Sequence, residues 1–376
     1  MHLSDLETPA LLLDEARMER NITRMRSHLA ALGVDFRPHV KTSKSIDVAR
    51  RMMTRPTGPI TVSTLKEAEY FLAHGVTDIL YAVGIAPGKL EHVVALRRKG
   101  ARLTVILDSV EAAQAVARAS QAAGDAVSAL IEIDSDGHRS GVQPGDPLLI
   151  DIARALESGG GELAGVMTHA GSSYNCRSVA AIRGMAEQER DAAVSCARRL
   201  REAGFAAPVV SVGSTPTATY ARDLTGVTEV RTGVFVFFDL FMAGLGVCSL
   251  DDLALTVLTT VIGHQRDKGW AIVDAGWMAM SRDRGTAKQA VDQGYGLVCN
   301  LDGQVIPEVI MVDANQEHGI VAHRSGNPSQ LPALPVGTLL RVLPNHACAT
   351  GAQHDRYHVV GADGAVSAVW PRFSGW

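Results

Sequence analysis

Two neighbouring lysines, Lys41 and Lys44, are the residues of this sequence best placed for covalent chemistry. Lys41 stands where a run typical of a strand, residues 35–40, passes into a turn, and a helical pattern opens at residues 43–45. A lysine held at the carboxyl end of a barrel strand can lose its proton and act as a Schiff-base amine or a general base. Lys41 is the first choice for that role and Lys44 the second. The alternative is that both are solvated loop lysines.

A second pair, His346 and Cys348, lies near the end of the sequence in the stretch PNHACAT. Alternation along a strand would place both side chains on one side, where imidazole and thiolate can share a metal ion. Two protein ligands leave positions for substrate and water, as a catalytic metal requires. Sulfur as a ligand favours zinc, with manganese or magnesium as alternatives. The competing interpretation is two half-buried residues without a metal.

The elements that must position Lys41 form a regular alternation of strand-like and helical runs. Eight such units within about 220 residues are typical of a (β/α)8 barrel, an α/β fold. The predicted strands cover residues 35–40, 60–63, 78–83, 102–108, 127–133, 163–169, 208–212 and 228–234. The predicted helices between them cover residues 66–74, 90–99, 110–123, 148–156 and 180–203. Beyond residue 250, short β runs broken by Gly, Asn, Asp and Pro predict a mostly antiparallel β domain.

Composition limits the class of protein. The chain has 376 residues, 46% hydrophobic and 20% charged, which is typical of a soluble globular protein. A net charge of -4 gives no basic field for nucleic acid. Neither a membrane-spanning run nor a signal-peptide pattern is present, so we expect a cytoplasmic protein with no membrane partner. The five scattered cysteines, without a CxxC pair, do not predict a disulfide framework.

Residues at the ends of the predicted strands converge on one face of a barrel. After the seventh strand come Gly213, Ser214 and Thr215, and RTGV with Gly233 closes the eighth. Loops after strands seven and eight commonly bind phosphate in this fold. A lysine, a phosphate site and a barrel together indicate pyridoxal 5'-phosphate, with Lys41 as its Schiff-base lysine.

Two further strand-end residues are candidates for that cofactor site. His169 can lie against the cofactor ring, or it can be a hydrogen-bonded barrel histidine. Arg139, in the turn GHRSG, can donate to the phenolic oxygen of the ring, or it can form a structural salt bridge.

Several motifs in order resemble the fold-type III pyridoxal phosphate enzymes of the D-serine dehydratase and D-threonine aldolase group. They are TPALLLD, RPHVKTSKS, VSTLKEAE, EIDSDGHRSGV, THAGSSY, SVGSTPT, DAGWMAMSRDRGT, NQEHG and PNHACAT. The resemblance runs nearly end to end. It implies an alanine-racemase-type barrel over residues 15–250, a β domain built from residues 1–14 and 251–376 that carries the metal site, and a homodimer.

The resemblance also implies roles for particular residues. It gives Lys41 the Schiff base and His346 with Cys348 the metal, and it places Tyr174 near the substrate and Arg231 at the pyridine nitrogen. An arginine there would disfavour ring protonation and leave more of the work to the metal. The phosphate would be held by Gly213, Ser214, Thr215, Gly233 and Val234.

The activity implied by the resemblance is a lyase reaction on D-3-hydroxy amino acids. D-threonine aldolases of the group carry His-x-Asp at the metal and the D-serine dehydratases His-x-Cys, so His346-Ala347-Cys348 favours a dehydratase. D-threo-3-hydroxyaspartate, converted to oxaloacetate and ammonia, is the expected reaction. Arg282 or Arg284 could hold the second carboxylate of that substrate, or could form a salt bridge within a helix or turn. The alternatives are a D-serine dehydratase, an aldolase that releases glycine and an aldehyde, and a non-catalytic cofactor carrier.

Overall fold

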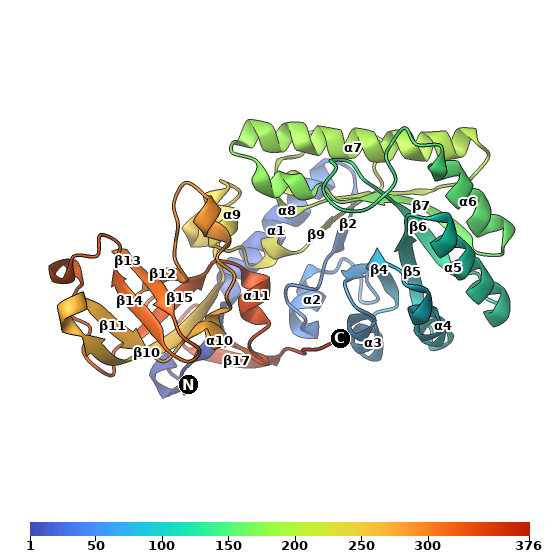
Figure 1. Cartoon of the computed structure of the whole chain (residues 1–376). Coiled ribbons are helices and arrows are strands. Elements are labelled where there is room, and N and C mark those ends of the chain that lie inside the picture. Colours follow the sequence, from blue (N-terminus) through green and yellow to red (C-terminus); the bar gives the residue numbers. More distant parts are fainter. The chain divides into compact units, whose positions relative to one another are not determined.

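The computed structural model describes residues 1–376, and these fold into two compact units. One unit comprises Arg24–Gly233 with Gly375–Trp376, and the other comprises Met1–Thr23 with Val234–Ser374. The helix α1 (Glu15–Ala31) runs from the second unit into the first (Figure 1). The domain boundaries expected from the sequence, at residues 14/15 and 250/251, stay a prediction.

The unit of residues 24–233 is an eight-stranded parallel barrel. Neighbouring strands follow the order β2-β9-β8-β7-β6-β5-β4-β3, and a single parallel bridge between His39 and Thr61 joins the two end strands. The predicted barrel is therefore confirmed, with the ring nearly closed. The strands are β2 (Asp35–Pro38), β3 (Ile60–Val62), β4 (Asp78–Gly84), β5 (Arg102–Leu107), β6 (Ser128–Ile133), β7 (Glu162–Thr168), β8 (Val209–Val212) and β9 (Glu229–Thr232).

Helices follow the barrel strands (Figure 1), and all of them except α8 lie where hydrophobic periodicity predicts a helix. They are α2 (Ile46–Met52), α3 (Leu65–Ala73), α4 (Leu90–Arg98), α5 (Val110–Ala123), α6 (Leu148–Ser158), α7 (Val179–Glu202) and α8 (Thr215–Tyr220). Helix α5 has local signals at both ends. The Ser109 side chain accepts from the Ala112 N–H at its start, and Gly124 ends it in the left-handed conformation, with φ of 65°.

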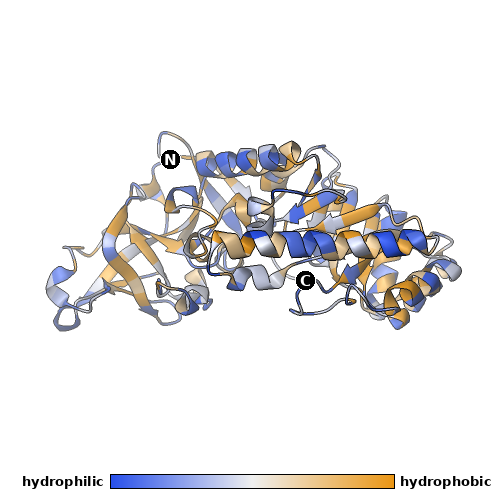
Figure 2. Ribbon diagram, turned by 90° about the horizontal axis from the view of Figure 1, so that it is seen from above, coloured by the Kyte–Doolittle hydropathy of each residue, from blue (hydrophilic) through white to orange (hydrophobic).

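One part of the barrel interior is an apolar cluster. Leu80, Ile106, Leu130 and Met167, from four adjacent strands, pack together in a buried cluster. Figure 2 shows that the strands are largely hydrophobic and that the helices carry both hydrophobic and hydrophilic residues. Such amphipathic helices bury one side against the sheet.

The other unit is built on a nine-stranded, mostly antiparallel sheet. Its order is β11-β14-β13-β12-β15-β10-β1-β16-β17, and only β1 with β16 is a parallel pair. This confirms the predicted antiparallel β domain. The strands are β1 (Ala10–Asp14), β10 (Leu255–Gln265), β11 (Trp270–Val273), β12 (Gly296–Cys299), β13 (Val305–Ala314), β14 (Gly319–His323), β15 (Leu339–Pro344), β16 (Arg356–Val360) and β17 (Val366–Pro371).

Strand β1 lies inside that sheet and not at its edge. Leu12 pairs with Thr256 of β10 on one side and with His358 of β16 on the other. The run ALLLD is apolar on both faces, and Leu11, Leu12 and Leu13 are all buried. No helix in the protein combines the length and the apolar character that crossing a membrane requires.

Candidate active site

Lys41 lies in the turn that follows β2 and the His39–Thr61 bridge, as the sequence predicts. Its side chain is exposed, whereas its neighbours Thr42 and Ser43 are fully buried. The backbone N–H of Lys41 donates to Nδ1 of His39 at 3.4 Å. The turn is therefore anchored in the barrel while the lysine amine stays accessible.

Lys44, the second candidate lysine, differs from Lys41 in being ion-paired. Its Nζ lies 3.3 Å from Oε1 of Glu67, whose side chain is fully buried. The other Glu67 oxygen accepts the Ser63 N–H at 2.8 Å. Burial raises the pKa of Glu67, and Lys44 and Lys41 both oppose that rise. A lysine that compensates a buried carboxylate is poorly suited to a covalent role, so the geometry favours Lys41.

Two imidazoles flank this turn, and both are held neutral. Burial is the main cause that lowers the pKa of His39, and the charges of Lys41 and Arg231 add to it. Burial likewise lowers the pKa of His169 to about 3. The Nδ1 of His169 lies 2.9 Å from the carbonyl oxygen of Gly213. Since that oxygen can only accept, Nδ1 carries the hydrogen and Nε2 is left with a lone pair.

The ring of Tyr174 stands near His169, with the centroids 6.1 Å apart and the planes inclined by 48°. Tyr174 belongs to the short helical turn η3 (Gly171–Asn175) that follows β7. The structure thus brings two predicted site residues together at the end of one strand. Their roles toward cofactor and substrate stay predictions.

Arg231 on β9 is buried and fixed by two hydrogen bonds. Its Nε donates to the Ser211 hydroxyl at 2.8 Å, and one terminal nitrogen donates to the Thr168 carbonyl oxygen. The other terminal nitrogen has no partner in the protein and is not sealed from solvent. Burial lowers the pKa of Arg231, against the opposing charges of Glu229 and Glu189. An oriented guanidinium with one open donor is what the predicted contact with the pyridine nitrogen needs.

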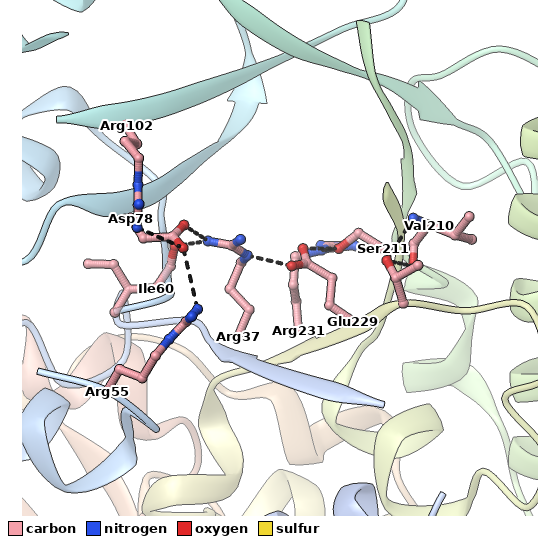
Figure 3. A network of polar contacts seen from close by, with 10 residues as sticks. Arg37, Arg55, Ile60, Asp78, Arg102, Val210, Ser211, Glu229 and Arg231 are labelled. Carbon is pink, nitrogen blue, oxygen red and sulfur yellow. Dashed lines mark hydrogen bonds and ion pairs between the residues drawn. The ribbon is translucent and has the colours of Figure 1, made fainter. Parts of the chain in front are cut away.

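A chain of polar contacts continues from Arg231 across the barrel interior (Figure 3). The Ser211 hydroxyl donates to Oε1 of Glu229 at 2.7 Å, and Oε2 of Glu229 accepts from Nε of Arg37 at 2.8 Å. Arg37 also donates to Oδ1 of Asp78 at 2.8 Å. Sequence reasoning missed Arg37, Ser211 and Glu229, because lone polar residues inside strands give no signal of their partners.

The predicted phosphate residues meet at the ends of β8 and β9. Gly213, with φ of 138°, follows β8, and a Cβ there would collide with the backbone of Arg231. Ser214 caps α8, and its hydroxyl lies 2.9 Å from that of Ser173. The hydroxyl of Thr215 lies 2.6 Å from that of Thr232. The loops after the two strands are therefore locked to each other and to η3.

Gly233 supplies the observation that fits an anion. It is buried, and its N–H makes no hydrogen bond in the protein. In a buried residue the backbone N–H usually has an acceptor. A Cβ at Gly233 would lie 2.8 Å from the His39 carbonyl oxygen, so this loop directly adjoins the Lys41 turn. Val234, the remaining predicted residue, begins the helical turn η4 (Val234–Val236) in the other unit.

Glu189 on α7 is a further residue that sequence reasoning missed. It is almost fully buried, and its Oε1 accepts the N–H groups of Ala170 at 2.8 Å and Gly213 at 3.1 Å. Its Oε2 accepts the Thr217 hydroxyl at 2.7 Å. Burial raises the pKa of Glu189, while these donors and Arg231 oppose the rise. One carboxylate thus ties together the loops after β7 and β8. The available signal was a glutamate on the buried face of a long helix.

Arg139 lies in the loop after β6, where its guanidinium is 3.4 Å from Oε1 of Glu132. The structural salt bridge considered from the sequence therefore exists. The Arg139 side chain is nevertheless 59% exposed, which leaves most of its donors accessible. Its contact with the cofactor stays a prediction.

The stretch that carries His346 and Cys348 is not a strand, so that local prediction was wrong. Strand β15 ends at Pro344, His346 is an extended N-cap, and Cys348 is the second residue of the short helix α11 (Ala347–Gly351). The helix forms because Asp239 accepts the Ala347 N–H at 3.0 Å and the Thr350 N–H returns to the His346 carbonyl oxygen at 3.0 Å. The two side chains still lie close enough for Cys348 to raise the pKa of His346.

The surroundings of His346 are anionic. Its Nδ1 lies 2.6 Å from Oδ2 of Asp283. Burial alone would lower the pKa of His346, but Cys348, Asp283 and Asp239 outweigh it and raise that pKa to about 11. Negative groups around an imidazole and a thiol fit a divalent cation by charge and by donor type. No set of three or more His, Cys, Asp or Glu residues converges as ligands in the protein.

The two arginines considered for a distal carboxylate have different surroundings. Arg284 is ion-paired with Asp292 at 2.8 Å and stacks over the ring of Tyr295. Arg282 stacks over the ring of Trp277 at 5.2 Å from the centroid. Arg282 thus remains the better candidate.

Comparison with protein families gives two matches that together cover most of the chain. Residues 13–240 match the N-terminal domain of alanine racemase, and residues 254–360 match the serine dehydratase domain. The first match confirms an alanine-racemase-type barrel.

One known dehydratase matches this chain along its whole length. D-threo-3-hydroxyaspartate dehydratase of Delftia sp. (strain HT23) is 57% identical over 100% of this chain and 99% of its own. The solved structure of that enzyme superimposes with a TM-score of 0.97, 56% identity and full coverage of both chains. One further structure of it is a cysteine-to-alanine variant in the metal-free form.

More distant relatives carry other activities of the same group. D-serine dehydratase of Dictyostelium discoideum is 28% identical over 97% of this chain and 96% of its own. The crystal structure of D-threonine aldolase from Filomicrobium marinum matches with a TM-score of 0.83 and 27% identity, over 98% of this chain and 96% of that one. The chain therefore belongs to the D-serine dehydratase and D-threonine aldolase group of fold-type III pyridoxal phosphate enzymes.

Proposed function

We propose that the protein is a pyridoxal phosphate- and divalent-metal-dependent dehydratase of D-3-hydroxy amino acids. Its first substrate is D-threo-3-hydroxyaspartate, converted to oxaloacetate and ammonia. The observation that carries the proposal is the 57% identity, over the whole chain, to the Delftia enzyme of that activity. The accessible Lys41 amine and the His346–Cys348 pair supply the two parts that such a reaction needs.

The barrel residues would bind and orient the cofactor. Bound there, pyridoxal phosphate would delocalise the electron pair left at Cα of the substrate. Lys41 would hold it covalently and then, as a free amine, take the Cα proton. The open nitrogen of Arg231 would face the pyridine nitrogen, and the Gly233 N–H would serve the phosphate. The imidazole of His169 would stay neutral, so its Nε2 would be free to accept a hydrogen bond.

The metal would act on the leaving hydroxyl. His346 and Cys348 would hold a divalent cation, which would polarise the β-hydroxyl and favour its departure as hydroxide. The thiol favours zinc, and manganese or magnesium are the alternatives. Metal analysis of the purified protein decides among them.

Product analysis tests this function. The purified, metal-loaded enzyme is given D-threo-3-hydroxyaspartate, and ammonia with oxaloacetate is measured against glycine with glyoxylate. We expect ammonia and oxaloacetate in equal amounts from the wild type and neither from Lys41→Ala. Glycine with glyoxylate would overturn the dehydratase and assign an aldolase.

The aldolase is the second candidate, because the D-threonine aldolase structure matches 98% of this chain. The same site would then remove the proton of the β-hydroxyl, and the bond between Cα and Cβ would break. A D-serine dehydratase would carry out the same type of reaction on D-serine, which lacks the second carboxylate. To distinguish the two dehydratases, kcat/KM is measured for D-serine and for D-threo-3-hydroxyaspartate. The ratio of the two values is then compared between the wild type and Arg282→Ala.

Two assignments about the protein as a whole accompany this function. A homodimer is implied by the resemblance to the group, and light scattering tests it. A cytoplasmic location is supported by five cysteines that are all free thiols.

A further inference from the structure

Asp283 contacts His346 although it lies far from it in the sequence, in the motif SRDRG. Its Oδ2 is 2.6 Å from Nδ1 of His346, and both side chains are half-buried, with 39% and 41% exposure. A short, charge-assisted hydrogen bond of this kind fixes the ring direction. The proposed function gives Asp283 no role.

The loop that carries Asp283 is attached to the residue before His346. The buried Asn345 side chain donates to the carbonyl oxygens of Gly294 at 2.7 Å and of Asp283 at 3.4 Å. Its Oδ1 accepts the Thr286 hydroxyl at 2.9 Å. One amide thus holds both ends of the loop against the strand end that presents His346.

The backbone just before Asp283 is strained in a way that serves this placement. Ser281 has φ of 75°, a left-handed value that non-glycine residues rarely adopt. Its hydroxyl accepts the Asp283 N–H at 3.1 Å and closes a tight turn. Strain that the surroundings sustain is commonly found at functional sites.

The other nearby carboxylate is already engaged. Asp239 accepts the Met242 N–H at 2.9 Å with one oxygen and the Ala347 N–H at 3.0 Å with the other. It therefore stabilises the first turns of two short helices, α9 (Leu240–Gly244) and α11, and makes no hydrogen bond to an imidazole nitrogen. Asp283 is left as the carboxylate that can orient the ring.

The direction of the hydrogen bond decides which nitrogen can bind a metal. The ionised carboxylate of Asp283 can only accept, so Nδ1 of His346 carries a hydrogen, and Nε2, whose own proton a bound cation would displace, is the nitrogen that can serve as a ligand. Carboxylates that accept from the far nitrogen of a ligating histidine fix its tautomer and orientation. We propose that Asp283 is a positioning residue of this metal site, which holds His346 with Nε2 presented to the cation beside the Cys348 sulfur. The inference rests on the metal site of the proposed function.

Metal affinity tests the inference without using the reaction. The holoenzyme of the wild type, Asp283→Ala and Asp283→Asn is stripped of metal and titrated with Zn²⁺ and with Mn²⁺ against a competing chelator. Asp283→Ala should bind both ions about 10- to 100-fold more weakly, as loss of such a partner typically causes. Asp283→Asn keeps an oxygen acceptor for Nδ1 and should recover most of the affinity.

A matched control separates positioning from loop damage. Asp292 lies in the same loop and pairs with Arg284, but it does not contact His346. Asp292→Ala should leave the metal affinity unchanged. In Co²⁺-substituted protein, Asp283→Ala should alter the ligand-field bands and keep the thiolate charge-transfer band, because Cys348 is untouched. The melting temperatures of the metal-free variants report any general loss of folding.

Each remaining outcome is decisive. Equal affinity in the wild type and Asp283→Ala would overturn the positioning role and leave the proposed function intact. Equal weakening in Asp283→Ala and Asp292→Ala would also overturn it, in favour of loop damage. A wild type that binds neither ion would overturn the inference together with the metal part of the proposed function, while product analysis would still decide the reaction.

Discussion

The Nε of Arg231 donates a hydrogen bond of 2.8 Å to the hydroxyl of Ser211. Because Ser211 in turn donates to Glu229, the guanidinium is held by a carboxylate that it does not itself contact. This arrangement keeps Arg231 charged in a buried place and turns its open nitrogen to one side. A direct ion pair would have used up that nitrogen.

Replacing Ser211 with alanine should disturb the cofactor more than the fold. The Arg231 Nε would lose its acceptor, which costs about 1–3 kcal/mol for a buried donor and frees the guanidinium to turn. We expect a shifted absorbance maximum of bound pyridoxal phosphate and an altered pH dependence of that spectrum. Ser211→Thr keeps the hydroxyl and should retain the wild-type spectrum. Identical titration curves for wild type and Ser211→Ala would contradict the role given to Arg231.

Substitution of Lys41 and of Lys44 should have different effects, because the two lysines have different roles. Lys41→Ala should lose the cofactor absorbance and the covalent linkage trapped by borohydride reduction, whereas Lys44→Ala should keep both. Lys44→Ala should instead lower stability by about 3–5 kcal/mol, because the buried Glu67 carboxylate loses its partner. The measurement is urea unfolding combined with mass spectrometry of the reduced protein.

A compensating change tests the explanation for Lys44. In Lys44→Ala with Glu67→Gln, no buried charge remains and the glutamine oxygen still accepts the Ser63 N–H, so much of the lost stability should return. Trapping of the cofactor on Lys44 instead of Lys41 would reverse the assignment.

Glu189→Ala should weaken the binding of pyridoxal phosphate although Glu189 is not expected to contact the cofactor. Two backbone N–H groups and the Thr217 hydroxyl would lose their acceptor, at about 1–3 kcal/mol for each donor left unpaired. The loop of Gly213 would then be less ordered, and the dissociation constant for pyridoxal phosphate should rise several-fold. Glu187→Ala, an exposed change on the same helix, is the control. Unchanged cofactor affinity in Glu189→Ala would show that the loop holds without this carboxylate.

The low pKa of His169 predicts an acid sensitivity with a definite sign. The pKa of His169 is about 3 in the folded protein against its ordinary value of 6.5, so between these two pH values the unfolded chain binds a proton at His169 that the folded chain does not bind. The contribution to stability is complete above pH 6.5 and is lost as the pH falls toward 3, at up to about 1.4 kcal/mol per pH unit. In cofactor-free protein, His169→Gln should lose less stability than the wild type over that range, as measured by urea unfolding at each pH. Parallel curves for the two proteins would contradict this prediction.

The barrel could be predicted from the sequence because its strands and helices are each specified locally. Helix α5 was predicted at Val110–Ala123 and is found there, since a serine cap, a periodic apolar face and a terminal glycine all agree. Strand positions were right to within one or two residues, because buried parallel strands are short apolar runs between turns. Lys41 and the glycine loops followed from the fold, as barrel strand ends converge.

The polar supports of the site could not be predicted, since they depend on register and tertiary contact. Arg37 and Arg231 are direct neighbours across β2 and β9, and only that alignment brings Glu229 to Arg37. Asp283 reaches His346 only through the folding of a loop. The prediction of a strand at His346 was wrong for a related reason. The run ACAT suits strand and helix alike, and the distant carboxylate of Asp239 decides for the helix.

The place of β1 between β10 and β16 has a consequence for synthesis on the ribosome. The first strand of the chain finds one neighbour only after residue 255 has been made and the other only after residue 356. The barrel of residues 24–233 is complete long before that, so it can fold while ALLLD still lacks partners. Before β10 has been made, the nascent chain carries an apolar strand with two unpaired edges, and one of these edges stays unpaired until β16 has been made. The unit with His346 and Cys348 can therefore be completed only after the barrel residues have been made.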